Sequence, residues 1–253
     1  MKTSTPSLLA LLTLLAPTFS APTPPTGVSF PITDLLDTDL TIDEYAAQLE
    51  GQQTSETTST ALTKRQYNGD TYNQLTDGTP CRPITVIYAR GTTQAGNVGA
   101  PDVEGPTFFN ALAARVGGTG QLAIQGVDYP ANIFGFLAGG DAGGATTMFN
   151  LINTAATRCP NTKIVVSGYS QGAQLVHTAT QRLSASTASR ITAVVTFGDA
   201  DRDESFGVVA ASKVLIICHE GDNICDNGII VTAAHRNYEI DAPVAAAFVA
   251  ARV

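Results

Sequence analysis

Short apolar runs alternate with longer amphipathic runs along residues 66–253. The short runs are rich in β-branched residues, as is typical of buried strands, and cover 84–90, 122–129, 162–168, 191–199 and 213–222. The longer runs carry apolar residues at helical spacing and cover 107–116, 145–159, 172–184 and 242–253. Strands that alternate with helices of this length predict an α/β fold with a parallel sheet covered on both faces. Ligands of such sheets bind at the carboxyl ends of the strands.

The first residues follow a different pattern. Lys2 precedes an apolar run over 8–16, and small residues follow near Ser20. This arrangement predicts a secretory signal peptide over residues 1–20, and therefore a secreted, extracellular protein. The apolar run is too short to span a bilayer and no later run does better, so we expect no stable membrane insertion.

Residues 21–65 are rich in Pro, Thr, Ser, Asp and Glu, with little apolar content after Leu40. Such a composition predicts a disordered segment. The segment ends in Lys64-Arg65, a dibasic pair typical of a processing site, so we interpret 21–65 as a pro-segment. The alternative is a linker with an incidental Lys-Arg pair. Residues 66–253 are enough for one domain with a complete core.

Charge and cysteine content narrow the classes of partner. The formal net charge is −8 and no cluster of Lys and Arg occurs, so nucleic acid is not expected as a partner. An even number of cysteines in a secreted chain indicates disulfides, and sequence alone permits three pairings of these four. We predict the pairs Cys81–Cys159 and Cys218–Cys225. There is no CxxC motif and His219 has no second pair of ligands nearby, so we predict no metal site and no cofactor.

The stretch GYSQG, residues 168–172, matches the nucleophile-elbow pattern G-x-S-x-G. Side chains two residues before and after such a serine would collide with neighbouring backbone, so both positions favour glycine. The pattern alone is weak, and an ordinary glycine-rich turn is the alternative. A predicted strand precedes it and a predicted helix follows it, which is the context that the motif requires. We therefore predict Ser170 as a nucleophile.

A serine hydroxyl needs a base, and the chain offers His177, His219 and His235. In enzymes with this elbow the chain order is Ser, then Asp or Glu, then His. His177 lies two turns along the helix that starts at the elbow, and we interpret it as a helix-surface residue. His219 precedes the best acid and breaks the order. His235 comes last, in a loop before the final helix, and is the predicted base.

The acid that orients this histidine is predicted to be Asp222. It follows a predicted strand and lies within CHEGDNIC, between Cys218 and Cys225, so a disulfide there would hold the carboxylate in place. The competing carboxylates follow another strand end, and we interpret them as a solvated acidic turn; they are Asp199, Asp201 and Asp203. The oxyanion hole is predicted from the backbone N–H of Gln171 and from Thr92 in the loop after the first strand.

These stretches together resemble the fungal cutinases of carbohydrate esterase family 5. The resemblance rests on YARGTTQAG, GYSQGA, CHEGDNIC and a histidine 13 residues after Asp222, and it covers about 66–253. It implies a three-layer α/β-hydrolase fold with a central five-stranded parallel sheet and no lid. It also implies the triad Ser170, Asp222 and His235, the oxyanion residues Thr92 and Gln171, and the two disulfides predicted above. The implied activity is hydrolysis of carboxylic esters, including cutin and short-chain esters. We expect a monomer.

The chain departs from the family pattern at three places. Thr92 stands where cutinases commonly carry serine. Arg236 follows the base, where an apolar residue is common, and it adds a charge beside the predicted substrate wall of Ile229, Ile230 and Val231. The segment 129–144 is bulky, and its residues are predicted either as the opposite wall of an acyl groove or as core packing; they are Ile133, Phe134, Phe136 and Leu137.

Two other functions stay open at this point. An acetylxylan esterase of the same family would have a smaller, more polar site; the apolar residues 228–231 argue against it and Arg236 argues mildly for it. A secreted protein that binds without catalysis would reuse the fold, although every catalytic position is filled.

Overall fold

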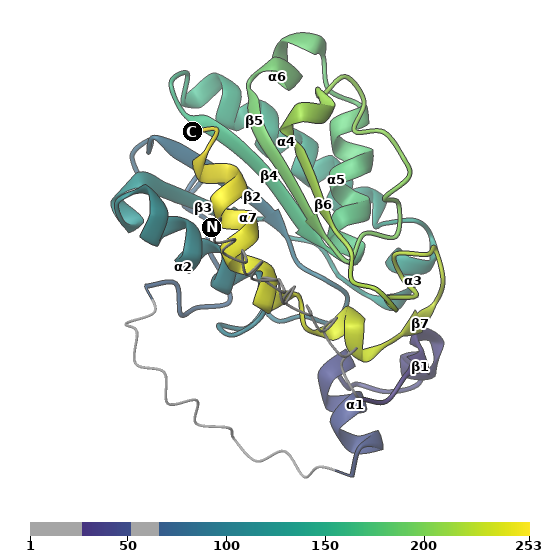
Figure 1. The fold of residues 1–253 in the computed structure, drawn as a ribbon. Coiled ribbons are helices and arrows are strands. Elements are labelled where there is room, and N and C mark those ends of the chain that lie inside the picture. Colours follow the sequence, from purple (N-terminus) through teal and green to yellow (C-terminus); the bar gives the residue numbers. More distant parts are fainter. Residues whose placement is uncertain (1–26, 52–65) are drawn as a thin grey trace, which may run out of the picture.

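The computed structural model describes residues 27–51 and 66–253. The predicted signal peptide and the Lys64-Arg65 pair lie outside the described residues. Figure 1 shows a central sheet with helices on both faces and a small N-terminal unit at one end of it.

The predicted five-stranded parallel sheet is confirmed. Its strands lie in the order β3-β2-β4-β5-β6 and all neighbours are parallel. Their bounds are β2 Ile84–Ala89, β3 Leu122–Gly126, β4 Lys163–Tyr169, β5 Ile191–Phe197 and β6 Val214–Ile217. Every residue of β2 and β3 is buried, as expected where helices cover both faces of a parallel sheet.

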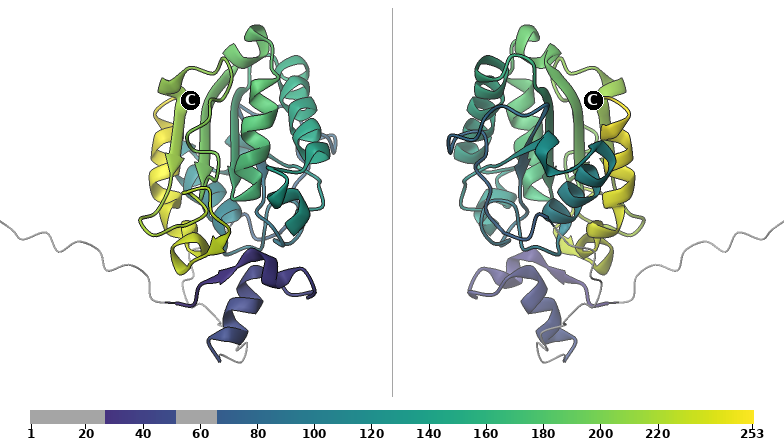
Figure 2. Two further views of the ribbon diagram at one scale, coloured as in Figure 1. Left: turned by 90° about the vertical axis from the view of Figure 1, so that its right-hand side faces the viewer. Right: turned by 90° about the vertical axis from the view of Figure 1, so that its left-hand side faces the viewer.

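Helices α2 (Glu104–Val116) and α7 (Ala242–Ala250) cover one face, and α4 (Ala142–Arg158) and α5 (Gln171–Gln181) cover the other (Figures 1 and 2). Side chains alternate between the faces along each strand. In β2, Val86 and Tyr88 join the cluster under α2 and α7, whereas Ile87 and Ala89 join the cluster under α4 and α5. The core is therefore two apolar layers separated by the sheet.

Several short elements were not predicted. They are α3 (Ile133–Leu137), α6 (Ala185–Ser189) and the 3₁₀ turns η2 (Thr119–Gln121), η3 (Ala211–Lys213), η4 (Ala233–Arg236) and η5 (Tyr238–Asp241). None is long enough to show helical periodicity. Asn132 begins α3 by accepting a hydrogen bond from Gly135 N, which orders the bulky segment identified in the sequence.

The prediction that residues 21–65 are disordered is wrong for residues 27–51, which we call the cap segment. It contains β1 (Phe30–Pro31), η1 (Ile32–Leu35) and α1 (Ile42–Leu49), and a capping box between Thr41 and Glu44 starts α1. Figure 2 shows it packed across the carboxyl ends of the central strands. Phe30, Ile32, Leu35 and Ile42 are buried, which composition alone could not reveal.

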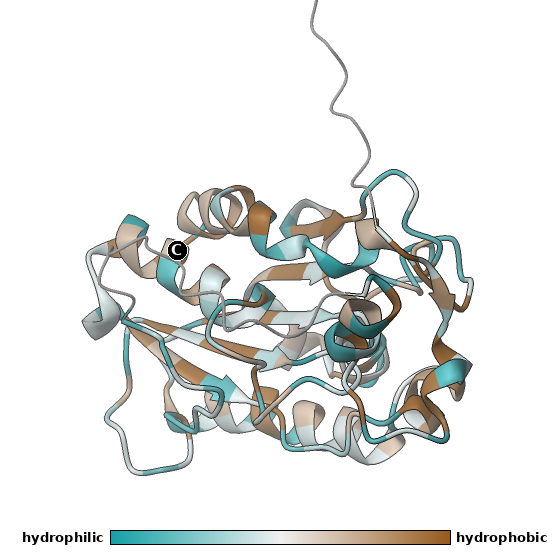
Figure 3. Cartoon of the chain, turned by 90° about the horizontal axis from the view of Figure 1, so that it is seen from below, coloured by the Kyte–Doolittle hydropathy of each residue, from teal (hydrophilic) through white to brown (hydrophobic). Residues whose placement is uncertain are grey.

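Both predicted disulfides are present. Cys81 is bonded to Cys159, at the end of α4, and Cys218 is bonded to Cys225. Figure 3 looks at the molecule from the end that carries the cap segment, coloured by hydropathy, with apolar positions along the central strands. Within the described ranges, no helix combines the length and the apolar character needed to cross a bilayer.

Candidate active site

Ser170 lies at the sharp turn between β4 and α5. Its backbone has φ +53° and ψ −121°, a conformation that costs a non-glycine residue energy and that surrounding structure must hold. A Cβ on Gly168 would lie 2.3 Å from the carbonyl oxygen of Gly172, and a Cβ on Gly172 would lie 2.1 Å from that of Ala89. Both glycines of the motif are therefore required by close backbone contact, as the sequence argument predicted.

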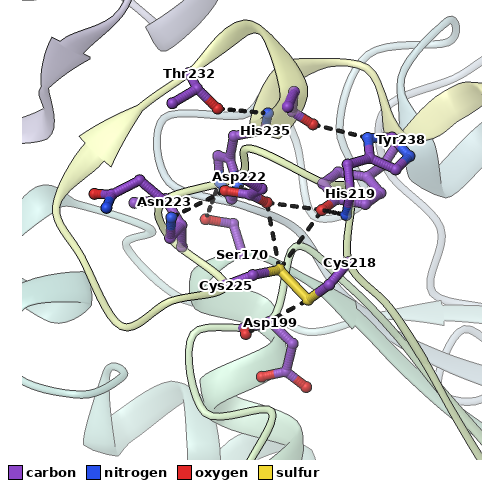
Figure 4. Close-up of polar contacts among 12 residues, drawn as sticks. Ser170, Asp199, Cys218, His219, Asp222, Asn223, Cys225, Thr232, His235 and Tyr238 are labelled. Carbon is purple, nitrogen blue, oxygen red and sulfur yellow. Dashed lines mark hydrogen bonds and ion pairs between the residues drawn. A yellow bond between two sulfur atoms is a disulfide. The ribbon is translucent and has the colours of Figure 1, made fainter. Parts of the chain in front are cut away.

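An unbroken chain of hydrogen bonds links Ser170, His235 and Asp222 (Figure 4). His235 Nε2 lies 3.0 Å from Ser170 Oγ, and His235 Nδ1 lies 2.8 Å from Asp222 Oδ2. Each of the three residues is only 1% exposed. This is the geometry in which a base can take the serine proton while the acid fixes the tautomer of the imidazole.

The Asp222 carboxylate is held in its ionised form. Burial alone would raise its pKa, but hydrogen bonds from His235, Tyr238 and the Ile224 backbone, together with the charge of His235, lower the pKa below its ordinary value. The Cys218–Cys225 disulfide closes the loop that carries Asp222. The two ends of the loop, Cys218 and Cys225, are therefore covalently joined on either side of Asp222.

Two tyrosines complete the site, and the sequence analysis missed both. The hydroxyl of Tyr238 donates to Asp222 Oδ2 at 2.7 Å and accepts from His219 N at 2.8 Å. The hydroxyl of Tyr169 donates to the carbonyl oxygen of His235 at 2.8 Å, and its ring stacks on the imidazole at 5.2 Å. The only sequence signal is proximity, since Tyr169 precedes the nucleophile and Tyr238 follows the base by three residues.

The predicted oxyanion residues lie together beside Ser170. Gln171 Nε2 donates to Thr92 Oγ1 at 2.8 Å and to the carbonyl oxygen of Asn132 at 2.8 Å. Thr92 is 1% exposed and Gln171 is fully buried. Because Thr92 Oγ1 accepts from the amide, its own O–H is left to donate elsewhere. Neither backbone N–H has an acceptor within the described residues. Two unpaired donors are the groups that an oxyanion requires.

The other histidines have partners of their own. His177 is not on the surface as predicted: it is 1% exposed, its Nε2 lies 3.0 Å from Asp199 Oδ2, and it stacks on Phe206. Asp199 is correspondingly buried and is not part of a solvated turn, although Asp203 is exposed. α5 packs against the sheet, against α4 and, at His177, against Phe206, so nearly all its sides are buried. His219 Nε2 lies 2.6 Å from Asp241 Oδ2, away from Ser170.

The cap segment covers this site. β7 (Ile230–Val231), in the predicted substrate wall, pairs antiparallel with β1, and Ile229 O accepts from Ile32 N at 2.8 Å. On the opposite wall, Ile133 and Phe136 are buried in the same apolar cluster as the cap, while Phe134 and Leu137 are exposed. The resemblance implied a fold without a lid, whereas in the described chain residues 27–51 pack over the site.

Arg236 also faces the cap segment. Its Nη2 lies 3.2 Å from Glu50 Oε1, and its side chain is 15% exposed. The positive charge of Arg236, which the sequence placed beside an apolar wall, is thus paired with Glu50, a partner that the sequence analysis did not consider. A cavity of about 140 Å³ remains between α1 and the domain, lined by Thr92 and Tyr169 on one side and by Ile42 and Asp43 on the other.

No group of three or more His, Cys, Asp or Glu side chains among the described residues could hold a metal ion. The site is built from side chains and backbone donors of the protein, and the chemistry that this arrangement supports is acyl transfer through a serine nucleophile.

Comparison with known proteins gives consistent matches. The cutinase family model matches residues 80–253. A cutinase of Botryotinia fuckeliana is 47% identical over 67% of this chain and 82% of its own, and one of Pyricularia oryzae is 47% identical over 76% and 90%. A structure of Trichoderma reesei cutinase in complex with a phosphonate inhibitor has a TM-score of 0.66 and 39% identity, covering 86% of this chain and 85% of its own. The catalytic core of an acetyl xylan esterase from Trichoderma reesei, at 21% identity and a TM-score of 0.54 over 69% and 100%, shares the fold. The chain belongs to the cutinase family.

Proposed function

We propose that this protein is a secreted serine esterase that hydrolyses the ester bonds of cutin, related polyesters and short- to medium-chain esters. The observation that carries the proposal is the hydrogen-bonded chain from Asp222 through His235 to Ser170. The names of the relatives, which are cutinases, support the substrate class.

In the acylation step, Ser170 Oγ attacks the ester carbonyl carbon while His235 Nε2 takes the hydroxyl proton. The carbonyl oxygen becomes an oxyanion, which the backbone N–H groups of Gln171 and Thr92 and the Thr92 hydroxyl stabilise. The imidazolium then returns the proton to the departing alcohol oxygen, and the C–O bond of the ester breaks. Asp222 stabilises the imidazolium throughout, without taking its proton.

Deacylation repeats these roles with water as the nucleophile. His235 removes a proton from water, the hydroxide oxygen attacks the acyl carbon, and the same donors bind the second oxyanion. The bond to Ser170 breaks, the serine regains a proton from His235, and the carboxylic acid leaves. Every proton in the cycle is carried by His235, and the proposed cycle needs no metal or cofactor.

Acetylxylan esterase remains the second possibility for the substrate. Its one argument from the sequence is the charge of Arg236, which pairs with Glu50 while the cap segment is present and would lack that partner in the proposed mature domain. The apolar residues Ile229, Ile230 and Val231 beside the base favour a longer acyl chain.

The test is hydrolysis of p-nitrophenyl esters from acetate to palmitate by the chain that starts at Gln66, with Ser170→Ala in the same chain as the blank. Highest kcat/KM at butyrate or longer, lost in the variant, would support the cutinase activity. A sharp preference for acetate would favour the acetylxylan esterase. Absence of turnover in both proteins would favour a protein that binds without catalysis.

The secretory path is also a proposal. Residues 1–20 would be removed as a signal peptide and residues 21–65 as a pro-segment, leaving a monomeric catalytic domain of residues 66–253. N-terminal sequencing of the secreted protein tests this: the prediction is Gln66 as the first residue, and a protein that retains residues 27–51 would contradict it.

A further inference from the structure

The groove proposed to hold the acyl chain already has an occupant. One of its walls, β7, is extended by β1 through the pairs Phe30–Val231 and Pro31–Ile230. Backbone pairing of this kind fixes the register of the added strand and places alternate side chains in the neighbouring pockets. The first residues of the cap segment therefore bind one wall of the groove as an added strand, and the helical residues of η1 and α1 follow from it.

The side chains of the cap segment complete an apolar cluster with both walls. Phe30, Ile32 and Leu35 are at most 3% exposed. They pack in one cluster with residues of the domain, namely Ile133, Phe136, Ala200, Ile224 and Val231. Burial of large apolar side chains is the main source of affinity in such a contact. The positions that would accept a fatty acyl chain are filled by side chains of similar character.

Polar contacts close the other end of the cap segment over the oxyanion residues. Ile42 N donates to Thr93 Oγ1 at 2.9 Å, next to Thr92. Glu50 accepts from Arg236, the residue that follows the catalytic histidine. Between these contacts α1 roofs the cavity that Thr92 and Tyr169 line. The cap segment thus contacts the acyl groove, the oxyanion loop and Arg236, the residue next to the base.

This arrangement has a direct consequence for catalysis, resting on the proposed function. Ser170 and His235 are each 1% exposed with the cap segment in place. An ester held in a polymer can reach the serine only from outside, so the nucleophile must be uncovered before it can react.

We propose that the cap segment is an intramolecular inhibitor, which occupies the acyl groove and keeps esters from Ser170 until it is displaced or removed. The partner that the groove binds is thus residues 27–51 of the same chain. Removal of the pro-segment at the proposed processing site would uncover the nucleophile. The proposal depends only on the contacts of residues 27–51, and it can be tested without cleavage.

The test uses the full chain with Leu35→Asp, which places a charge in the buried cluster, and measures the rate at which a p-nitrophenyl alkylphosphonate labels Ser170, by mass spectrometry. The matched control is Leu49→Asp, the same change at an exposed position of the cap segment. We expect Leu35→Asp to label roughly 100-fold faster than the unaltered protein, because a buried leucine is lost from the contact and a charge is desolvated. Leu49→Asp should label at the unaltered rate.

Ile32→Ala provides a milder variant with no charge, should Leu35→Asp fail to fold. We expect it to label roughly 10-fold faster, because only part of the apolar contact is lost. Ser170→Ala is the blank. Equal labelling rates in the unaltered protein, Leu35→Asp and Ile32→Ala would overturn the inhibitor while leaving the esterase intact. If hydrogen exchange shows residues 27–51 released and Ser170 still fails to react, the proposed function itself is wrong and the inhibitor with it.

Discussion

Replacement of Tyr238 by phenylalanine tests how the carboxylate of Asp222 is held. The Tyr238 hydroxyl is the second donor to Asp222 Oδ2, the oxygen that also accepts from His235. Tyr238→Phe removes that donor and keeps the ring that packs between Tyr169 and His219. A hydrogen bond to a charged group contributes about 1.5–3 kcal/mol. Because roughly 1.36 kcal/mol corresponds to a tenfold rate, we expect kcat to fall about 10- to 100-fold if the full contribution acts in the transition state.

The pH profile separates this role from a purely structural one. Loss of the donor raises the pKa of Asp222, so the acid side of the pH profile of kcat/KM should move to higher pH, with KM little changed. The variant also leaves His219 N without its acceptor, so some loss of thermal stability is expected in any case.

Tyr88→Phe is the matched control, because Tyr88 is fully buried and its hydroxyl has no partner within the described residues. It should leave both kcat and the pH profile unchanged. A lower melting temperature in Tyr238→Phe with an unchanged kcat and pH profile would refute the positioning role.

Three further predictions follow from the same contacts. Asp222→Asn should lower kcat by about 10⁴ with the fold intact on circular dichroism, whereas Asp201→Asn should leave it unchanged; the reverse result would reassign the acid. Gly172→Ala should abolish folding or activity, because its Cβ would lie 2.1 Å from a backbone oxygen, and a fully active variant would contradict the elbow geometry. Burial raises the pKa of Glu104, which lines the cavity under α1, to about 8. To the extent that docking of the cap segment supplies this burial, protonated Glu104 stabilises the docked state at low pH and ceases to do so as pH rises through that value. The phosphonate-labelling rate of the unaltered protein, relative to Leu35→Asp, should therefore rise between about pH 5 and pH 9, and less so in Glu104→Gln; a constant ratio in the unaltered protein would refute this. The other titratable groups around this interface are Asp43, Glu44, Glu50, Asp102, His235, Arg236 and Glu239.

The strands and the site residues around Ser170 were accessible to sequence reasoning for physical reasons. A buried parallel strand must be apolar along its whole length, so 84–90 and 191–199 stand out against their surroundings. The elbow imposes glycine at two fixed positions, and chain order then selects one histidine. The position of Asp222 between Cys218 and Cys225 favours it over the competing carboxylates. These constraints are local or act through fixed spacing, which is why they can be read from one sequence.

The predictions for residues 27–51 and for His177 were wrong because the contacts that bury these residues join segments far apart in the sequence. β1 contains only Phe30 and Pro31, and its partner strand lies about two hundred residues later. The composition of residues 21–65 shows that the segment cannot fold by itself, but not that a groove elsewhere will bind it. His177 was misplaced for a related reason: helical spacing shows that it points away from Ser170, but not that Asp199 and Phe206 cover that side of the helix.

The shared use of one groove has a consequence for engineering the enzyme. Val231, Ile133 and Phe136 contact the cap segment, and the same residues form the proposed walls for the acyl chain. A polar substitution there weakens inhibitor and substrate together, so its effect on kcat/KM in the full chain is the difference between two losses. Leu35 belongs to the cap segment and contributes to docking but not to substrate binding. Its substitution therefore changes only the loss that concerns the inhibitor. Combining Leu35→Asp with a wall variant therefore isolates the contribution of the wall to substrate binding, and the wall variant should lower kcat/KM more in that background than alone.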